Sequence, residues 1–479
     1  MNKKIENAKL AVRLAAAFAI LIAGSMTVAD SIPPACQPQV SDTRVKDLQN
    51  LRWGMFVCWS FSTFSGKEWT PGITSLEIFH PTGCDTEQWV KTAKDAQMGY
   101  ILFLTKHHDG FCLWDTKTTD RKVTKCILGR DVLRELRAAC NKHGIKLAIY
   151  FSEGEWAWPN KPDGSRYQAD GGYNPEMKKA QLRELLTDYG PIEYIWFDHA
   201  IGDGGVSHEE TVAFCKALQP NCFVGFNHGP AAGDIRLGEL GHPSPLTDET
   251  GAGFNAGHMK GYTGYRLAEF TCPILPSHQG GAMWFYSLPE HGQLCLPAEK
   301  LYADYLGAVK YGNLFALDVG PDYSGRLREI DVQTLRKVGQ YIRSEIKLPP
   351  PPISRNKPAR ASSVWQGNSG FEASAAVDGD PSTRWGAVEN SRSGWLEVDL
   401  GEPTLVNRAV IDEGNWNRVR QFELQAQQEG VWITIATGAN LGLAKEMTFA
   451  PLAARVFRLN ILRADEVPTI CEFEVFAVR

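Results

Sequence analysis

An acidic residue ends one of the most apolar stretches of the sequence. The stretch Tyr194–Phe197 carries no charge, and Asp198 and His199 follow it directly. A carboxylate at the end of a buried strand needs a partner or a function, because burying an isolated charge is costly. A short carboxylate fixed on a rigid strand suits a nucleophile. The pattern therefore indicates Asp198 as a catalytic residue.

Further polar and aromatic residues follow other apolar stretches. They are Glu68 and Trp69; Lys106, His107, His108 and Asp109; Tyr150, Glu153, Glu155 and Trp156; and Asn227 and His228, with Glu269 inside a later stretch. Any one of them could be a capping or structural group, but the whole set is harder to explain in that way. Histidines and acids bind sugar hydroxyls, and aromatic rings cover sugar faces. The set favours a sugar site.

The elements that would position these residues form a regular alternation. Amphipathic helical stretches separate several of eight apolar stretches, and the connection after the sixth is short for a helix. The apolar stretches are Met55–Phe61, Tyr100–His107, Lys146–Ser152, Tyr194–Ala200, Cys222–His228, Arg266–Ile274, Ala282–Ser287 and Asn313–Gly320. Such strands predict a parallel sheet buried on both faces. The fold class is α/β, a (β/α)8-like barrel with its site at the carboxyl ends of the strands.

Glycoside hydrolysis needs two carboxyl groups across the scissile bond, and retaining enzymes hold them roughly 5–5.5 Å apart. Asp198 can supply the nucleophile. The residues alone leave the second group open. Its candidates are Glu239 in the stretch 233–241, Glu269, Glu249 and Glu153.

Several other functions are disfavoured. The net charge is -5 and no run of Lys or Arg occurs, so no nucleic-acid partner is expected. The glycine-rich Gly251–Gly257 does not follow a strand as a dinucleotide loop would. Adjacent residues on a strand point to opposite faces, so a metal on His107 and His108 would need a bend there. We expect no cofactor for catalysis.

The chain divides into four segments. Residues 1–29 have a basic start, a short apolar core and small residues for cleavage, which predict a signal peptide and a secreted or periplasmic protein. The alternative is an uncleaved anchor, although the apolar core is short for a stable membrane span. Residues 347–358 contain four consecutive prolines and form a linker between 40–346 and 359–479. The last segment has short alternating runs, which predict an all-β jelly-roll sandwich.

The stretch from about Leu51 to Arg343 resembles glycoside hydrolase family 29, the α-L-fucosidases. The most specific match is Tyr100–Asp120, and Trp53–Trp69, Leu147–Trp156, Tyr189–Asp198 and Gly312–Leu327 match in the same order. The resemblance implies a retaining exo-hydrolase that releases terminal α-L-fucose from fucosylated oligosaccharides or glycoconjugates through a covalent glycosyl-enzyme intermediate.

The resemblance also implies roles for individual residues. Asp198 is the nucleophile, and Glu239 is preferred as acid/base over Glu269 because the family usually takes this group from after the fifth strand. The substrate-binding residues are Phe56, Glu68, Trp69, His107, His108, Tyr150, Trp196, His228, Glu269 and Phe285. Among them, Phe56, Tyr150 and Phe285 would shape the pocket for the C6 methyl group of fucose.

Two departures from the family pattern bear on the substrate. Cys58 stands where the family usually has His, and Asn227 and His228 stand where it has an Arg. Both family residues normally touch the sugar, and His228 could replace the Arg contact. The alternatives are a retaining glycosidase for a related, galactose-like sugar and a catalytically inactive glycan-binding protein.

The segment Lys357–Arg479 resembles the F5/8 type C domain, also known as carbohydrate-binding module family 32. The resemblance implies a structural Ca²⁺ site at Asp378, Asp380, Thr383 and Glu472, and oxygen ligands of this kind suit calcium. Trp416 and Arg418 are candidates for contact with a glycan. The sequence does not indicate an oligomeric state.

Overall fold

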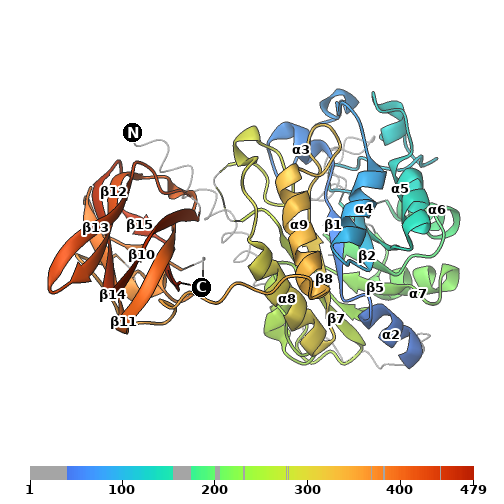
Figure 1. Cartoon of the computed structure of the whole chain (residues 1–479). Helices are drawn as coiled ribbons and strands as arrows, with labels where there is room; N and C mark the ends of the chain where they lie inside the picture. Colours follow the sequence, from blue (N-terminus) through green and yellow to red (C-terminus); the bar gives the residue numbers. More distant parts are fainter. Residues whose placement is uncertain are drawn as a thin grey trace.

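The computed structural model describes residues 40–478 except 155–173, 200–204, 230–231, 277, 279, 368, 381–382 and 443. The predicted signal peptide lies outside these residues, and so do Glu155 and Trp156. Figure 1 shows a barrel with helices, a β domain, and the segment that joins them. No helix within the described ranges is long and apolar enough to cross a membrane.

The first part is a parallel barrel, as predicted. Its strands are β1 (Trp53–Val57), β2 (Tyr100–Lys106), β3 (Lys146–Ser152), β4 (Tyr194–Asp198), β5 (Phe223–Phe226), β6 (Ile235–Arg236), β7 (Leu267–Pro273) and β8 (Leu314–Asp318). They pair in the order β5-β4-β3-β2-β1-β8-β7-β6. The Asp234 amide donates to the Val224 carbonyl at 2.9 Å, which links β6 to β5 and brings the sheet close to closure.

One predicted strand is wrong. Ala282–Ser287 is not a strand, and the sixth strand is instead the two-residue β6, so the predicted sixth stretch is β7. The run 282–287 is apolar because most of it packs in the interior, including Phe285 at 1% exposure. β6 was missed because two residues give no alternating pattern. The connection between β6 and β7 contains a 3-10 segment, η3 (Glu249–His258).

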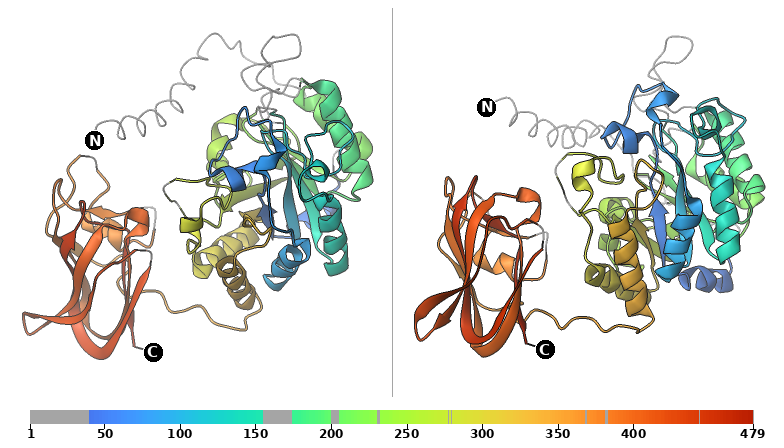
Figure 2. Two further views of the ribbon diagram at one scale, coloured as in Figure 1. Left: turned by 90° about the horizontal axis from the view of Figure 1, so that it is seen from above. Right: turned by 45° about the horizontal axis from the view of Figure 1, so that its top comes forward.

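Helices surround the strands (Figure 2). They are α2 (Asp42–Gln49), α3 (Phe61–Ser65), α4 (Thr86–Asp95), α5 (Val132–His143), α6 (Pro175–Asp188), α7 (His208–Leu218), α8 (Ala298–Tyr311) and α9 (Glu329–Ile342). Local sequence fixes several ends. Asp85 and Asp131 accept from backbone amides of the first turns of α4 and α5 at 2.9 Å, as N-cap residues do. α5 stops at Gly144, which has the left-handed φ of 69°.

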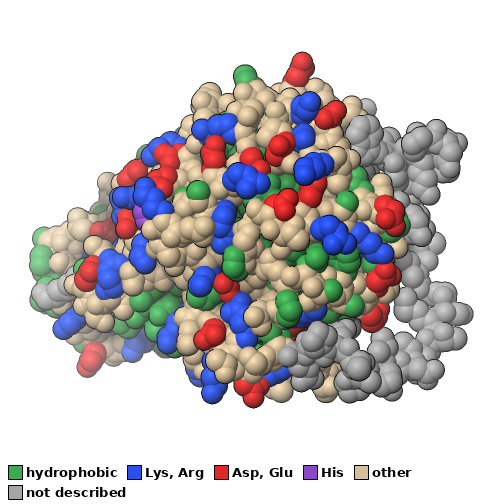
Figure 3. All heavy atoms as spheres, turned by 90° about the vertical axis from the view of Figure 1, so that its right-hand side faces the viewer, with side chains coloured by type: hydrophobic (Ala, Val, Ile, Leu, Met, Phe, Trp, Pro, Cys, Tyr) green, Lys and Arg blue, Asp and Glu red, His purple; other side chains and the backbone are tan. Residues whose placement is uncertain are grey.

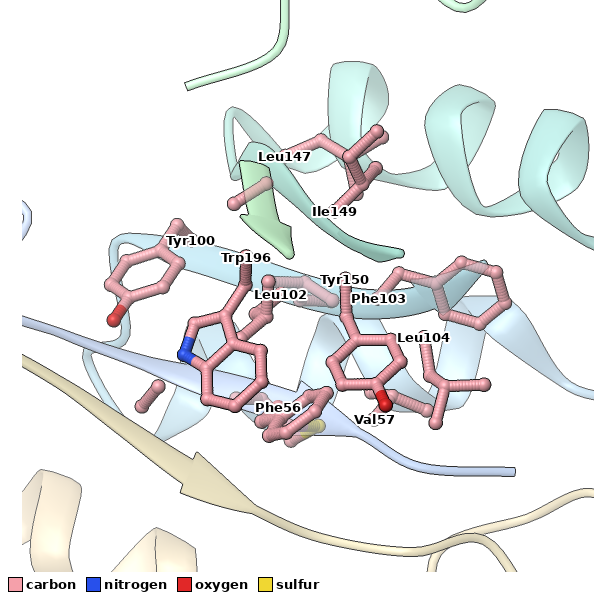
Figure 4. Close-up of a cluster of buried hydrophobic side chains, with 14 of the residues drawn as sticks. Phe56, Val57, Tyr100, Leu102, Phe103, Leu104, Leu147, Ile149, Tyr150 and Trp196 are labelled. Carbon is pink, nitrogen blue, oxygen red and sulfur yellow. The ribbon is translucent and has the colours of Figure 1, made fainter. Parts of the chain in front are cut away.

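The barrel interior is packed rather than hollow. All residues of β1, β2, β4 and β5 are buried, as expected for strands covered on both faces. Figure 4 shows Phe56, Tyr150 and Trp196 from three strands converging with aliphatic neighbours. The face of the molecule in Figure 3 carries acidic and basic side chains intermixed, with no field of one sign.

The second part is antiparallel and all-β, as predicted. A sheet in the order β13-β12-β14-β11-β16 uses β11 (Gly394–Asp412), β12 (Val419–Gln428), β13 (Val431–Gly438), β14 (Lys445–Ala464) and β16 (Glu472–Ala477). The strand β9 (Ala359–Ala361) pairs with β11, and β10 (Trp385–Gly386) pairs with β15 (Thr469–Ile470). Two runs that look separate in sequence form the single strand β11, with register shifts between them.

The second half of the proline-rich segment belongs structurally to this domain. The Ile353 amide donates to the Val475 carbonyl at 2.8 Å, and the Val475 amide donates to the Ser354 hydroxyl at 2.9 Å. Ser354 is buried.

Candidate active site

Asp198 is the last residue of β4, and three donors hold its carboxylate. The Tyr150 hydroxyl donates to Oδ2 at 2.5 Å, while the Asn227 amide and the His199 backbone N–H donate to Oδ1 at 2.9 and 2.7 Å. Such bonds satisfy a buried carboxylate and fix its direction. The acid at the end of the apolar strand is thus partnered from the neighbouring strands β3 and β5.

The backbone turns sharply after Asp198. His199 has φ of 52°, a left-handed conformation that is uncommon for a residue with a side chain. This turn brings its own N–H onto the preceding carboxylate. The His199 ring lies 5.5 Å from the His108 ring between centroids. His199 therefore orients Asp198 through its backbone.

Glu239 is brought to Asp198 by Asn227. One nitrogen, Asn227 Nδ2, donates to Asp198 Oδ1 at 2.9 Å and to Glu239 Oε2 at 2.8 Å. The two carboxyl oxygens therefore cannot be farther apart than the sum of those distances. Glu239 follows β6, and its backbone forms an isolated parallel β-bridge with Thr271 of β7. It therefore lies at a strand end rather than on a free loop. Its side chain is 15% exposed.

His228 also contacts Glu239. Its Nε2 lies 2.7 Å from Glu239 Oε2. Burial lowers the pKa of His228, but the hydrogen bond to Glu239 and the charges of Asp198 and Glu239 outweigh it, so the pKa is raised. A protonated His228 is therefore favoured next to the carboxylate. The predicted site residue His228 thus contacts one of the two candidate catalytic groups.

Asn255 is a site residue that the sequence analysis did not identify. Its Oδ1 accepts from the His228 backbone N–H at 2.9 Å, and its Nδ2 donates to Asn227 Oδ1. Asn255 is 1% exposed and lies in η3, within the glycine-rich stretch Gly251–Gly257. Gly253 has φ of 57°, and a Cβ there would collide with the Glu239 carbonyl. The glycines let this loop approach the site closely. The glycine-rich stretch was therefore the sequence signal for Asn255, but it was considered only as a dinucleotide loop.

The two adjacent histidines lie on a turn, not on a strand. β2 ends at Lys106, and the Gly110 amide donates to the His107 carbonyl at 3.0 Å. The bend places the two imidazole rings 4.2 Å apart. Nevertheless, the described residues contain no group of three or more His, Cys, Asp or Glu placed to hold a metal ion.

Both histidines are set up as neutral groups. Burial first, and neighbouring histidines second, hold the pKa of His107 and of His108 well below the ordinary value. His108 Nδ1 lies 2.6 Å from the Ser152 hydroxyl, and its Nε2 lies 3.5 Å from Asp198 Oδ2. His107 Nδ1 is buried without a hydrogen-bond partner among the described residues. A buried polar atom of this kind can bind a substrate hydroxyl.

Aromatic side chains form one wall around Asp198. The Tyr150 ring stacks on Trp196 at 5.3 Å and lies 5.7 Å from Phe56. Phe285 contacts His107 edge to face at 5.2 Å. Figure 4 shows Tyr150 and Trp196 side by side above Phe56. Four of the five predicted aromatic site residues, Phe56, Tyr150, Trp196 and Phe285, therefore lie near Asp198 or His107.

Glu68 and Trp69 differ in their surroundings. The Met283 and Trp284 amides donate to Glu68 Oε2 at 2.5 and 3.2 Å. Burial, opposed by these bonds, raises the pKa of Glu68 to about 7, and the charges of Glu239 and Asp198 contribute. Trp69, which follows Glu68 in the sequence, is 56% exposed at the surface.

The other candidate carboxyl groups are less suited to acid/base work. Glu269 is fully buried, and the Trp196 indole and the Gly238 amide donate to it at 3.3 Å. Burial raises the pKa of Glu269 to about 8. Glu153 is buried in an ion pair with Lys178 at 2.6 Å, and Glu249 is exposed in η3.

Asp318, which the sequence analysis did not single out, affects Cys58. Asp318, at the end of β8, is 2% exposed, and its charge acts on the Cys58 thiol. Burial raises the pKa of both groups well above their ordinary values, and the charges of Glu68 and Asp198 act on Cys58. The thiol therefore lies in the site where the family pattern has an imidazole.

Three of the four predicted calcium residues of the second domain, Asp378, Asp380 and Thr383, hydrogen-bond one another. The Thr383 hydroxyl donates to Asp378 Oδ2 at 2.8 Å and to the Asp380 carbonyl at 2.9 Å. Burial, with the charges of Glu474 and Asp378, raises the pKa of Glu472 to about 8. Glu472 Oε1 has no hydrogen-bond partner among the described residues. The charge of Asp378 acts on Glu472, but these acids do not form a group of three placed to hold a metal ion within the described residues.

Comparison with known proteins identifies the catalytic part. The sequence model described as alpha-L-fucosidase matches residues 35–346, about two thirds of the chain. The chain belongs to the α-L-fucosidase family. It is therefore a glycoside hydrolase, as predicted. The F5/8 type C domain model matches residues 358–474, which confirms the second resemblance.

Relatives and solved structures agree with this assignment. Alpha-L-fucosidase 1 of Arabidopsis thaliana is 27% identical, over 88% of this chain and 85% of its own length. Alpha-L-fucosidase of Dictyostelium discoideum is 26% identical, over 58% of this chain and 58% of its own length. A glycoside hydrolase 29 family member from a rumen bacterium shares the fold, with a TM-score of 0.52 at 23% identity over 93% of this chain and 78% of its own.

Proposed function

We propose that the chain is a retaining exo-α-L-fucosidase that forms a covalent fucosyl-enzyme on Asp198. The observation that carries this proposal is the bond pair from Asn227 Nδ2 to Asp198 and Glu239, at 2.9 and 2.8 Å. These distances hold the carboxyl oxygens closer than the roughly 6.5–9.5 Å of inverting enzymes, which must admit a water between the groups. The resulting upper limit on the separation of these two oxygens admits the roughly 5–5.5 Å of retaining enzymes.

In this mechanism Asp198 attacks the anomeric carbon. Its Oδ1 is held by two donors and its Oδ2 by the Tyr150 hydroxyl, so little reorganisation is needed when it forms a bond. Glu239 protonates the leaving oxygen and later removes a proton from the attacking water. Glu239 suits both steps because it is partly exposed, whereas Glu269 is fully buried.

His228 supplies the proton that Glu239 needs. The two groups lie 2.7 Å apart, and the His228 side chain is 42% exposed. The pKa of His228 is raised by this contact and by the charge of Asp198, so its imidazole keeps a proton beside Glu239. A shift of that proton from Nε2 to Oε2 turns the carboxylate into the acid. We propose that this pair replaces the family arginine.

The substrate is a terminal α-L-fucosyl group of a fucosylated oligosaccharide or glycoconjugate. Neutral His107 and His108 would bind hydroxyl groups, and the Phe56, Tyr150 and Trp196 rings would contact the apolar face and the methyl group. The family membership supports fucose over a galactose-like sugar. We also propose export of the chain to the periplasm or outside the cell through residues 1–29, which N-terminal sequencing of the mature protein would test.

The function is tested by following the hydrolysis of 4-nitrophenyl α-L-fucoside by proton NMR. We expect α-fucose as the first-formed anomer, before mutarotation produces the β-anomer. Asp198→Ala should bind the fucoside but not hydrolyse it. First formation of β-fucose would contradict retention. Faster hydrolysis of the matching aryl galactoside would favour the related-sugar alternative, and wild-type protein that releases neither sugar would favour a binding protein.

A further inference from the structure

The second domain contains an open pocket that the catalytic site does not use. Its volume is about 570 Å³, within the roughly 300–1,000 Å³ of small-molecule sites. It lies beside β10, and all its lining residues belong to residues 365–469. The side chains used below are Trp365, Phe371, Trp416, Arg384, Arg392 and Arg418.

Arg384 is held in this pocket by aromatic rings. Its guanidinium lies 4.8 Å from the Phe371 ring centroid and 5.1 Å from that of Trp416. Stacking of this kind fixes the guanidinium and leaves its N–H edge available for bidentate contacts. Among the described residues, Arg384 has no ion pair with a carboxylate. The pocket therefore presents an oriented cation without a protein counter-ion.

The other charges leave an excess of positive charge. Arg418 is compensated, because its Nε lies 3.0 Å from Glu466 Oε2. Arg392 donates to the Ser391 carbonyl at 3.1 Å and, within the described part of the chain, pairs with no carboxylate. Glu389 is exposed at the pocket wall. Two guanidiniums without ion pairs thus face one exposed carboxylate.

The charges of Arg384 and Arg392 also act on Arg418. Burial lowers the pKa of Arg418, and the charges of Arg384 and Arg392 lower it further against the effect of Glu466. Arg384 and Arg418 both lie over the Trp416 ring, and Arg392 lines the same pocket. Such a group favours an anion that can accept several N–H bonds at once, as carboxylate and sulfate groups do.

We propose that this pocket binds a pyranose that carries a carboxylate or sulfate group. Arg384 and Arg392 bind the anion, and the half-buried Trp365, which packs edge to face on Phe371 at 6.5 Å, covers the sugar ring. Trp416 is less available for the sugar because Arg384 and Arg418 both stack on it. The site would direct the enzyme to acidic glycans. The inference does not depend on the proposed catalytic mechanism.

The test measures binding to the full-length chain by titration calorimetry with three sugars that differ at C6. These are methyl galactoside, its 6-sulfate and methyl galacturonide. We expect both acidic sugars to bind at least about tenfold more tightly than the neutral one, and more weakly as salt is raised. Arg384→Gln should lose about tenfold or more for the acidic sugars. Unchanged thermal unfolding would show that the variant is folded.

Arg455→Gln is the matched control. Arg455 belongs to the same domain, pairs with Asp399 at 2.7 Å and does not line the pocket, so this variant should bind like wild type. Both variants should hydrolyse an aryl fucoside at the wild-type rate. Equal binding of the neutral sugar, undiminished binding by Arg384→Gln, or no saturable binding of any of the three sugars would overturn the proposal. Competition by inorganic sulfate as strong as by the acidic sugars would also overturn it, since the ring would then contribute nothing.

Discussion

His228 Nε2 lies 2.7 Å from Glu239 Oε2, and the same carboxylate oxygen accepts from Asn227 at 2.8 Å. One oxygen is thus contacted by both residues that follow β5. The two contacts have different roles. Asn227 sets the position of Glu239 relative to Asp198, whereas His228 sets its protonation, because only His228 can exchange a proton with it.

The first prediction concerns pH. The pKa of His228 is raised above its ordinary value, since the interactions with Glu239 and Asp198 outweigh burial. The shared proton is therefore kept as pH rises through the ordinary histidine range and is lost only above it. We expect the alkaline limb of kcat/KM to lie above pH 6.5, the ordinary value for histidine. His228→Gln should move that limb to lower pH. An unchanged limb in this variant would contradict the shared proton.

The second prediction concerns Asn227. Replacing it by Ala removes the donor common to Asp198 and Glu239, so the carboxylates repel each other and separate. We expect kcat/KM to fall about 10²-fold, the scale of losing a positioning contact. Asn221→Ala is the control, because Asn221 is exposed just before the same strand. Steady-state kinetics on an aryl fucoside would check this, and equal effects of the two substitutions would count against it.

The third prediction separates Glu269 from Glu239. The pKa of Glu269 is raised to about 8, so its favourable neutral form is retained at pH 5 and lost as pH rises through 8. Between these pH values Glu269 ionises in the unfolded chain but stays neutral in the folded protein, and this lowers the free energy of unfolding. The wild type should therefore lose free energy of unfolding between pH 5 and pH 8, whereas Glu269→Gln should not. Relative to the wild type, the free energy of unfolding of the variant should rise by roughly 2–4 kcal/mol over this range. Denaturant unfolding of the two proteins at both pH values measures this.

The activity of the same variant distinguishes the two carboxyl groups. Glu269→Gln should keep most of its kcat, because the amide can still accept from Trp196 and Gly238. Glu239→Gln should lose most activity on substrates with poor leaving groups and keep more on aryl fucosides. The reverse pattern would make Glu269 the acid/base.

The fourth prediction concerns calcium in the second domain. We propose that Asp378, Asp380, Thr383 and Glu472 hold Ca²⁺, since Glu472 Oε1 is buried without a partner among the described residues. Bound calcium would stabilise the ionised form of Glu472, whose pKa burial raises to about 8. Adding Ca²⁺ after chelation should raise the unfolding temperature of the wild type and have little effect on Glu472→Gln. An equal response of both proteins would argue against this site.

The sequence predicts the barrel and most of its site because both depend on local patterns. Buried strands such as Tyr194–Asp198 are continuous apolar runs, and their last residues necessarily lie at one rim. β6 is not predicted because a strand of two residues has no recognisable pattern. For the same reason the position of Glu239 at a strand end is not predicted. Asn255 is not predicted because its role depends on a tertiary contact with Asn227, and no local sequence pattern indicates that contact.

The account depends most on the separate roles of Asp198 and Glu239, and azide rescue of their glycine variants tests these roles most directly. With an aryl α-L-fucoside, azide should enter the cavity of Asp198→Gly, attack the sugar from the nucleophile's face and give β-fucosyl azide. In Glu239→Gly it should attack the fucosyl-enzyme and give α-fucosyl azide. NMR of the two products decides the matter. The α-azide from Asp198→Gly, or rescue of Glu269→Gly in place of Glu239→Gly, would contradict the account.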